Sequence, residues 1–429
     1  MKIAQLTPGS GDNFYCENCL RDVELVKALR RQGHDILLIP MYLPLQTETK
    51  DERLSSTPIF FGGINVYLQQ KFSIFRRTPR WVDRLFDSPK LLRWIGRKSD
   101  MTSAEELGQT TISMLLGENG RQKKELERLV NWLSEKENKP DVVCLSNALL
   151  AGLAKQIKET LGVPVACLLQ DEDTFVDKLP HNYAKQAWQI ISERCKHIDA
   201  FISVSKHYAG IMQQKLSLDE NKIHIVYTGI APEQYGPAEM RPSLPTIGFL
   251  SCMSEEKGLD ILIDAFILLK QKERFKNARL CIAGGQRGHD KAFIEEIHRK
   301  LTDHKIASDV EFLPDFDQKT RLEFLKKISV LSVPERHSPA FGLYVIEALA
   351  CCVPVVEPDT GVFVEILGQI SKDMLFKPNN PKALAETLEK ILSDDGFACR
   401  LGGEGRKAVI EKFDIETSAK ELVRIFEKL

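Results

Sequence analysis

Long apolar runs are missing from this sequence of 429 residues. No stretch approaches the roughly 18 consecutive apolar residues that a helix needs to cross a bilayer, so we expect no transmembrane segment. The N-terminus reaches Pro8 and Gly9 too early for a secretory signal peptide. An excess of charge of one sign is missing too, because the formal net charge is −1, which argues against a nucleic-acid partner. These absences predict a cytoplasmic protein.

A complete set of metal ligands is also missing around the pair Cys16 and Cys19. This Cys-x-x-Cys motif would need a second Cys or His pair at ligand spacing to close a zinc site, and none follows nearby. We therefore predict no metal. Two interpretations of the pair stay open: a redox-active pair at a helix N-terminus, where thiols are more acidic, or ordinary residues at the start of a helix.

Short apolar runs that alternate with amphipathic stretches fill the sequence from end to end. This alternation predicts βαβ units, and therefore an α/β fold of parallel sheets with helices on both faces. Prolines cluster between 237 and 245 and mark a linker, after which the alternation restarts. We predict one Rossmann-like domain over 1–240, a second over 241–410 and a C-terminal helix over 411–429. The expected strands include 35–40, 141–145, 163–169, 199–204, 246–250, 279–285, 310–313, 330–334 and 353–356.

One segment breaks the alternation, because about a hundred residues, roughly 43–138, separate the second expected strand from the third. Its middle, 71–98, carries nine Lys and Arg against Asp83 and Asp87, with aromatic residues interleaved. Two interpretations stay open. The segment is an amphipathic patch that binds an anionic membrane surface or a lipid-linked acceptor, or it is a helical subdomain whose aromatic side chains fill its own core.

A glycine-rich turn follows the first expected strand. Gly9 and Gly11 stand between that strand and a helix. Such a turn presents bare N–H groups at a helix N-terminus, where anions bind. We therefore predict that Gly9 and Gly11 contribute to a binding site for an anionic ligand.

Two loops of the second half are expected to meet at one edge of its sheet. The first, 251–258, carries Lys257 between an expected strand and a helix. The second, 334–342, ends where a helix begins at Phe341–Gly342, with Glu347 in the second turn of that helix. A Lys beside one strand end and a helix N-terminus beside another form a cradle for a diphosphate, in the crevice where open α/β sheets bind ligands.

These residues resemble motifs of the family 4 glycosyltransferases, and the resemblance extends over essentially the full length. The motifs are the glycine turn at 9–11, Val-Ser-Lys-His-Tyr at 204–208, Ile-Val-Tyr-Thr-Gly-Ile at 225–230, Glu-Lys-Gly at 256–258 and Phe-Gly-Leu-x-x-x-Glu-Ala at 341–348. That family has the GT-B fold: two Rossmann-like domains face each other across a cleft, and a C-terminal helix crosses back to the first domain. Its members transfer a sugar from a nucleotide diphosphate with retention at the anomeric carbon, usually without a metal. The resemblance therefore implies a nucleotide-sugar partner of the UDP or GDP type and no cofactor.

The resemblance also implies roles for particular residues. The leaving diphosphate gains negative charge, so catalysis depends on cations and N–H dipoles positioned around it. In the family a Lys and an Arg clamp the phosphates, and two Glu eight positions apart hold the donor. By motif, Lys257 takes the Lys role and Glu347 contacts the ribose. Gly342 and Leu343 lie where backbone N–H groups meet phosphate, and Phe341 beside them is also a donor-binding candidate.

Two donor-binding positions depart from that pattern. Cys252 stands where the Arg is expected, and Pro339 stands where the first Glu is expected. Cys cannot make a bidentate guanidinium contact, and Pro offers neither a carboxylate nor an N–H. The residues nearby that would have to compensate are Glu335, Arg336, His337 and Arg287.

Polar residues also follow the fourth expected strand of the first domain, at 170–173. The family often carries a His near the transferred sugar at this place. We predict that Gln170 hydrogen bonds a sugar hydroxyl and that Asp171 or Asp173 orients an acceptor, so Gln170 and Asp171 join Lys257 as catalytic candidates. The other interpretation is that the acidic run only caps the helix that follows.

The expected function is retaining transfer of a hexose to a glycan, lipid-linked or small-molecule acceptor. We expect a role in envelope or exopolysaccharide synthesis, with peripheral contact to the inner membrane surface. The departures at positions 252 and 339 favour an alternative, a transferase of reduced activity or a degenerate one that serves as a binding or scaffold protein. A sugar-nucleotide epimerase or a phosphorylase is a third interpretation, because the fold alone does not decide the reaction.

Overall fold

The computed structural model describes residues 1–8, 17–42, 60–61, 66, 69–70, 104–238, 242–286, 290–313 and 318–429. The described chain divides into two compact units. Unit 1 contains most of the described residues up to Tyr227 together with Ser418–Leu429, and unit 2 contains the described residues of Thr228–Thr417.

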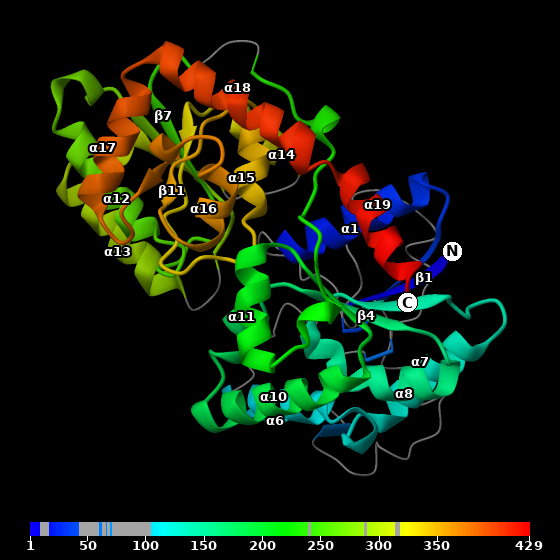
Figure 1. Cartoon of the computed structure of the whole chain (residues 1–429). Helices are drawn as coiled ribbons and strands as arrows, with labels where there is room; N and C mark the ends of the chain where they lie inside the picture. Colours follow the sequence, from blue (N-terminus) through cyan, green and yellow to red (C-terminus); the bar gives the residue numbers. More distant parts are fainter. Residues whose placement is uncertain are drawn as a thin grey trace. The chain divides into compact units, whose positions relative to one another are not determined.

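Unit 1 is built on a parallel sheet of six strands in the order β2-β1-β3-β4-β5-β6 (Figure 1). The strands are β1 (Lys2–Thr7), β2 (Asp35–Pro40), β3 (Val142–Leu145), β4 (Val165–Leu169), β5 (Ala200–Ser203) and β6 (Ile223–Ile225). Strands β3, β4 and β5 are buried at every residue, because helices cover both faces of a parallel sheet. Their apolar sequences follow from that burial.

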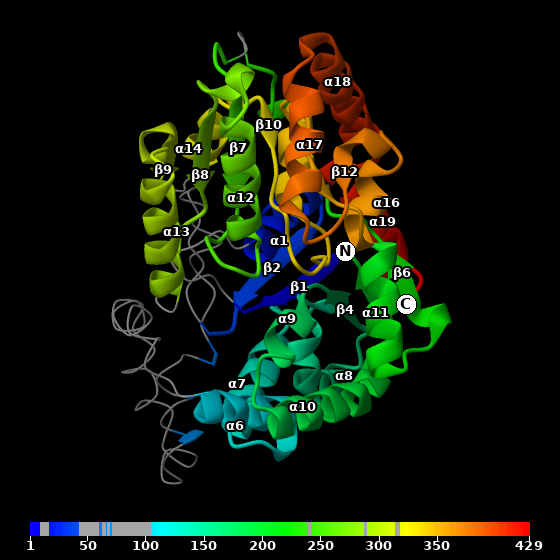
Figure 2. The same ribbon diagram turned by 90° about the vertical axis from the view of Figure 1, so that its left-hand side faces the viewer.

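The helices of unit 1 begin and end at residues suited to those positions. Ser205 caps α11 by accepting a hydrogen bond from the N–H of Tyr208, and Gly162 ends α8 in the left-handed region. Helix α10 lies beside α6 in both views (Figures 1 and 2). The helices are α1 (Glu17–Arg31), α6 (Ala104–Leu115), α7 (Lys123–Ser134), α8 (Ala154–Leu161), α9 (Glu172–Val176), α10 (His181–Arg194) and α11 (Lys206–Leu216).

Unit 2 has a second parallel sheet in the order β10-β7-β8-β9 and a short parallel pair, β11-β12. The strands are β7 (Thr246–Leu250), β8 (Arg279–Ala283), β9 (Val310–Leu313), β10 (Val330–Leu331), β11 (Glu357–Pro358) and β12 (Leu375–Phe376). The helices are α12 (Leu259–Lys270), α13 (Lys291–Asp303), α14 (Gln318–Lys326), α15 (Leu343–Ala350), α16 (Gly361–Leu367), α17 (Pro381–Leu392), α18 (Asp395–Lys412) and α19 (Ile415–Phe426), the last of which passes into unit 1.

Helix α15 occupies the centre of unit 2. All eight of its residues are buried, and it packs beside α18. Its sequence is apolar on every face except at Glu347, which is the pattern of a helix surrounded by protein. A buried charge on such a helix requires partners from its neighbours.

The expected strand at 353–356 is wrong in extent, and β10 ends at Leu331 rather than at Pro334. Residues 353–356 were expected to pair along the sheet, but only Val355 does so, through a single bridge to Leu331. Pro354 has no N–H to donate, which limits pairing at this point. The regular strand β11 begins at Glu357 and pairs with β12 instead.

The C-terminal helix returns to unit 1. Ser418–Leu429 belong to unit 1 by their contacts, and Ser418 Oγ donates a 2.8 Å hydrogen bond to the carbonyl of Tyr227. Figures 1 and 2 both show the two ends of the chain on the same side of unit 1. Within the described residues, every helix is too short or too polar to cross a bilayer.

Several sequence predictions fall outside the described residues. They are Gly9, Gly11, Cys16, Arg287 and the basic, aromatic segment 71–98. The described part of the predicted insertion 43–138 includes the helices α6 and α7.

Candidate active site

The loop before α12 is shaped by Gly258. This residue has φ +70°, in the left-handed region, and it caps the helix. A Cβ atom at this position would lie 1.9 Å from the carbonyl oxygen of Pro334, so only glycine fits. The close approach of Gly258 to Pro334 brings the loop of Lys257 against the loop 334–342. The two sequence motifs of the second half are therefore neighbours, as predicted.

Lys257 forms an ion pair within this site. Its Nζ lies 2.6 Å from Oε2 of Glu335, and the hydroxyl of Tyr344 donates to the other carboxylate oxygen at 3.0 Å. Glu335 is only 4% exposed, whereas the side chain of Lys257 is 27% exposed. The Lys257 side chain is therefore partly accessible to solvent, and a phosphate that bound its ammonium would compete with Glu335.

A second buried acid, Glu357, lies near the same pair. Its Oε1 accepts a 2.9 Å hydrogen bond from the N–H of Val333. Burial raises the pKa of Glu357 well above its ordinary value, and the neighbouring charge of Glu335 raises it further. Burial thus favours the protonated form of Glu357, and Glu335 is the carboxylate that lies 2.6 Å from the ammonium of Lys257.

Glu347 is held by two partners. Its Oε1 accepts a 2.7 Å hydrogen bond from the hydroxyl of Tyr235 and lies 3.0 Å from Nε of Arg321 in an ion pair. Both charged side chains are 5% exposed or less. The carboxylate predicted to contact a ribose is therefore fixed in orientation by residues of its own unit.

The helix N-terminus predicted to meet phosphate is present at α15. Gly342 caps the helix with φ +87°, which favours glycine, and Leu343 is the first helical residue. The ring of Phe341 packs edge-on against Phe413, with 5.8 Å between the centroids. The Phe341–Gly342 turn is thus anchored to the end of α18.

The two departures from the family pattern have their own neighbours. Cys252 is buried, and its Sγ lies 3.9 Å from Oδ2 of Asp290. Beside Pro339, the Oγ of Ser338 accepts a 2.9 Å hydrogen bond from the N–H of Val362 in the first turn of α16. These contacts stabilise the fold of unit 2 around both positions.

Two of the residues considered as replacements are engaged elsewhere in the loops. Arg336 lies 2.5 Å from Asp260 and donates to the carbonyl of Glu255 at 3.0 Å, so it holds the start of α12. Glu335 pairs with Lys257, as described. The sequence neighbours of Cys252 and Pro339 therefore tie the two loops together.

In unit 1, Gln170 is buried at the end of β4. It is 3% exposed, and its Nε2 donates a 2.5 Å hydrogen bond to the carbonyl of Ser146, which follows β3. Asp171 next to it has φ +56°. A non-glycine residue in this region costs roughly 1–3 kcal/mol, and such strain is typical of functional sites.

The acidic run at 171–173 does more than cap a helix. Asp171 occupies the N-cap position of α9 without a side-chain capping bond. It is Glu172 that accepts hydrogen bonds, each of 2.8 Å, from the N–H groups of Ala148 and Gln170. The hydroxyl of Tyr208 lies 2.8 Å from Glu172 and 2.9 Å from Asp173. Burial raises the pKa of Glu172 to about 7.

A buried charged pair on α1, Arg21 and Asp22, was not among the residues predicted from the sequence. Arg21 and Asp22 are 7% and 3% exposed, and Asp22 accepts a 3.1 Å hydrogen bond from the hydroxyl of Thr7. Burial raises the pKa of Asp22 to about 6. The signal was present, because Asp22 is on the same helical face as the buried Leu25 and Leu29, where a charge is unusual.

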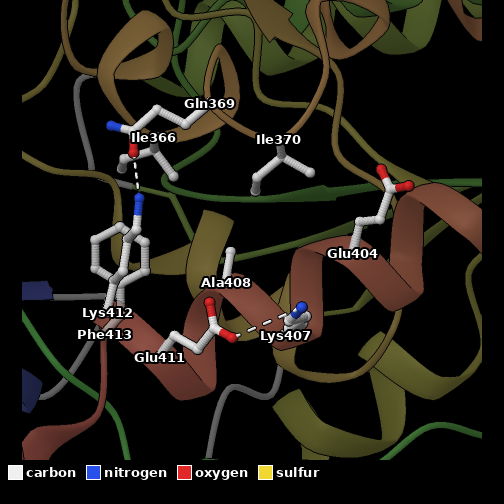
Figure 3. Close-up of a pocket in the computed structure, with 9 residues that line it drawn as sticks. All are labelled: Ile366, Gln369, Ile370, Glu404, Lys407, Ala408, Glu411, Lys412 and Phe413. Atoms are coloured by element: carbon white, nitrogen blue, oxygen red, sulfur yellow. Dashed lines mark hydrogen bonds and ion pairs between the residues drawn. The ribbon is translucent and has the colours of Figure 1, made fainter.

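A separate surface groove lies between α16 and α18 (Figure 3). It has a volume of about 370 Å³. Its nine lining residues are Ile366, Gln369, Ile370, Glu404, Lys407, Ala408, Glu411, Lys412 and Phe413. The predicted donor residues do not line it, although Phe413, which does, also contacts Phe341.

Solved structures share this architecture over the full length. Sucrose-phosphate synthase from Thermosynechococcus elongatus has a TM-score of 0.73 at 16% identity, over 100% of this chain and 98% of that chain. Anabaena HepE, solved in complex with UDP and glucose, has a TM-score of 0.71 at 14% identity, over 100% of both chains. At these identities the likeness shows the fold, and the predicted α/β fold of the GT-B class is confirmed.

Family models match both halves of the sequence. The model for glycosyltransferase family 4 matches residues 95–234, and the model for glycosyl transferases group 1 matches residues 236–408. Together they cover well over half of the sequence, and the chain belongs to the family 4, or group 1, glycosyltransferases.

Curated relatives are similar at low identity. The chain is 27% identical over 239 residues to an uncharacterised glycosyltransferase of Methanocaldococcus jannaschii. It is 25% identical over 224 residues to the D-inositol 3-phosphate glycosyltransferase of Jonesia denitrificans. The matches cover 52% and 49% of this chain, and 59% and 52% of those two proteins, so the chain spans little more than half the length of these relatives.

Proposed function

We propose that this protein is a retaining glycosyltransferase that moves a hexose from a nucleotide diphosphate to an acceptor. The observation that carries the proposal is the contact between the Lys257 loop and the loop 334–342, which leads into the N-terminus of α15. Family membership supports transferase activity. HepE was solved with UDP and with UDP-glucose, which supports a donor of the UDP type.

In this proposal unit 2 binds the donor through opposite charges. Lys257 and the N–H groups at Gly342 and Leu343 hold the diphosphate, and they stabilise the charge that grows on it as the sugar leaves. Glu347, fixed by Tyr235 and Arg321, accepts hydrogen bonds from the ribose hydroxyls. For the donor to bind and react, its phosphates must partly replace the carboxylate of Glu335 as the ionic partner of Lys257.

Unit 1 provides the acceptor side in the same proposal. Gln170 and Asp171 lie at the carboxyl end of β4, where parallel sheets bind ligands. The acceptor class is a glycan, a lipid-linked sugar or a small molecule, and the cellular role is envelope or exopolysaccharide synthesis. Peripheral contact with a membrane surface and a reaction without metal or cofactor belong to the same proposal.

The test is a thermal-shift screen of the full chain against UDP, GDP, ADP and TDP sugars. A ligand at 100 times its dissociation constant adds about 2.7 kcal/mol of stability, which gives a clear shift. We expect a shift with one nucleotide class and a smaller one after Glu347→Gln. A protein that shifts with none of these donors does not act as proposed.

A second candidate function is a degenerate transferase that binds a partner. It is favoured by Cys252 beside Asp290 and by Pro339, because neither position supplies the expected charge. Losing one positioned charge costs about 10²-fold or more in rate. The double change Cys252→Arg and Pro339→Glu distinguishes the two functions. Turnover that appears only in this variant supports the degenerate protein, and turnover in the unchanged chain supports the enzyme.

A further inference from the structure

Helix α18 lies close against α15, the helix that carries the predicted donor residues. The two helices run antiparallel, because residues later in α18 meet residues earlier along α15 and the turn after it. A Cβ atom added to Gly402 would lie 2.0 Å from the carbonyl oxygen of Cys352, and one added to Gly405 would lie 2.5 Å from Cδ2 of Leu349. At Gly402 the neighbour is backbone, so only glycine fits. This close approach brings the next residue, Arg406, to the C-terminal end of α15.

Arg406 joins the end of α15 to a second segment of unit 2. Its Nη1 donates hydrogen bonds to two carbonyls, that of Ala350, the last residue of α15, and that of Tyr235 at 2.7 Å. Carbonyls in the last turn of a helix have no partner within the helix, and the helix dipole favours a cation beside them. Arg406 therefore ties the end of α15 and the backbone of Tyr235 to one nitrogen.

The side chain of Tyr235 returns to the same helix. Its hydroxyl donates to Oε1 of Glu347 at 2.7 Å, in the turn of α15 that ends at Ala350. Burial raises the pKa of Tyr235, and so does the charge of Glu347, so the hydroxyl keeps its proton and remains a donor. Arg406, Tyr235 and Glu347 thus form a chain of contacts that starts on α18 and ends at the carboxylate predicted to contact the ribose.

Tyr235 depends on such contacts because it lies in an irregular segment. It follows a single helical turn, Pro232–Gln234, and belongs to no helix or strand. Backbone groups outside helices and sheets need other partners, and the side chain of Arg406 provides one for the carbonyl of Tyr235. Tyr235 is only 5% exposed. A change at Arg406 is therefore expected to move Tyr235, and with it the hydroxyl that meets Glu347.

We propose that Arg406 is a positioning residue of the donor site: by fixing Tyr235 and the end of α15, it sets the orientation in which Glu347 receives the ribose hydroxyls. Arg406 acts through Tyr235 and does not touch the donor. The inference rests on the proposed function, in which Glu347 contacts the ribose. The alternative is a purely structural role, in which loss of Arg406 lowers stability and leaves recognition of the ribose unchanged.

The test compares UDP with its 2′,3′-dideoxy analogue, because the ratio of their dissociation constants reports the ribose contact. Arg406→Met removes the charge and the donors but keeps a long side chain. We expect it to lower the preference for UDP by about three- to tenfold, within the range of couplings in one hydrogen-bond network. Arg406→Lys keeps a cation that can donate to either carbonyl, but not the planar guanidinium, so its preference should lie between those of Arg406→Met and the unchanged chain.

Arg400→Met is the matched control. Arg400 lies on the same helix, with its guanidinium carbon 5.2 Å from the centroid of the Phe397 ring. Its loss removes an arginine from α18 without touching Tyr235 or α15, and we expect the preference for UDP to stay unchanged.

A double-mutant cycle shows whether Arg406 acts through Tyr235. In Tyr235→Phe the hydroxyl that meets Glu347 is absent, so adding Arg406→Met is expected to change the preference by less than about twofold. A full effect of Arg406→Met in that background overturns the inference.

Isothermal titration of the full chain measures each constant, at a temperature where circular dichroism shows every variant folded. If Arg406→Met does not fold, Arg406→Lys replaces it in the comparison. A chain that prefers UDP over the analogue, and keeps the same preference when Arg406 is changed, overturns this inference alone. An unchanged chain that binds UDP and the analogue equally, or binds neither, overturns the proposed role of Glu347 in the donor site together with the inference.

Discussion

The ammonium of Lys257 lies 2.6 Å from the carboxylate of Glu335, four residues before the position where Pro339 replaces the expected donor-binding Glu. Tyr344 holds the other oxygen of that carboxylate at 3.0 Å. The pair joins the two loops of the predicted donor site, and it also occupies the one Lys that the family motif assigns to the diphosphate. Stability and donor binding therefore depend on the same contact.

Lys257→Ala is expected to lower the free energy of unfolding by about 1–3 kcal/mol, because it leaves the buried Glu335 without its cation. Adding Glu335→Gln to this variant removes the buried charge and is expected to recover most of the loss. Urea denaturation of the two variants measures both steps. Equal stabilities for Lys257→Ala and the unchanged chain would show that the ion pair contributes nothing to the fold.

Glu335→Gln alone is expected to tighten UDP binding by roughly tenfold, which is about 1.4 kcal/mol, because a competing carboxylate is removed from Lys257. Glu389→Gln is the matched control, since Glu389 pairs with Lys272 at the surface. Titration calorimetry measures both dissociation constants. Weaker binding in Glu335→Gln would mean that Glu335 positions the Lys rather than competing for it.

Gly258→Ala is expected to reduce both stability and donor binding. Gly258 and Gly162 both cap helices with positive φ, but only Gly258 faces a carbonyl 1.9 Å from the added Cβ. Gly162→Ala should cost about 1 kcal/mol, the ordinary penalty of the left-handed region, and leave nucleotide binding unchanged. Thermal unfolding and UDP titration of the two variants make the comparison. Similar losses of stability and UDP affinity in the two variants would show that the close approach of Gly258 to Pro334 does not shape the donor site.

Tyr235→Phe is expected to cost about 1–3 kcal/mol of stability, because the buried carboxylate of Glu347 loses the hydroxyl that donates to it at 2.7 Å. The dissociation constant for a nucleotide should rise, since the carboxylate of Glu347 loses a hydrogen bond that orients it. Binding of UDP compared with a 2′,3′-dideoxy analogue isolates the ribose contact. If Tyr235→Phe weakens both ligands equally, Glu347 does not contact the ribose hydroxyls.

Asp22 makes the stability of unit 1 depend on pH. Burial raises its pKa from 3.8 to about 6, so the folded chain binds this proton more tightly than the unfolded chain. The contribution of Asp22 is therefore most favourable below pH 4 and is lost as the pH rises to about 6. The shift corresponds to roughly 2–3 kcal/mol. Asp22→Asn should be more stable than the unchanged chain at pH 7.5 and nearly equal to it at pH 4, as measured by urea denaturation. If Asp22→Asn is less stable than the unchanged chain at pH 7.5, the pKa of Asp22 is not raised by burial.

The fold was predictable because the apolar runs of β3, β4, β5 and β7 are buried on both faces, which leaves a direct pattern in the sequence. The exception, 353–356, depends on where Pro354 breaks the pairing, and a run of apolar residues does not reveal that. The placement of Gly258 and Gly342 at helix starts was also readable, since turn residues between a strand and a helix mark such loops.

The side-chain pairing was not predictable. Lys257 and Glu335, or Glu347 and Tyr235, come from elements 78 and 112 residues apart, and sequence spacing does not give their distance. Arg21 and Asp22 left a signal in the helical pattern of α1, but their partners at Thr7 and Gln170 follow from the strand order of the sheet. Sequence motifs locate the loops of a site, and packing decides which charges meet there.

The most direct test of the account is titration of UDP into the unchanged chain and into the double variant Lys257→Ala with Glu335→Gln, whose fold does not contain an unpaired buried charge. We predict binding to the unchanged chain and a loss of at least about tenfold in the double variant, whose stability is close to that of the unchanged chain. Equal affinity in the two proteins would show that Lys257 does not hold the diphosphate, and would contradict the proposed donor site.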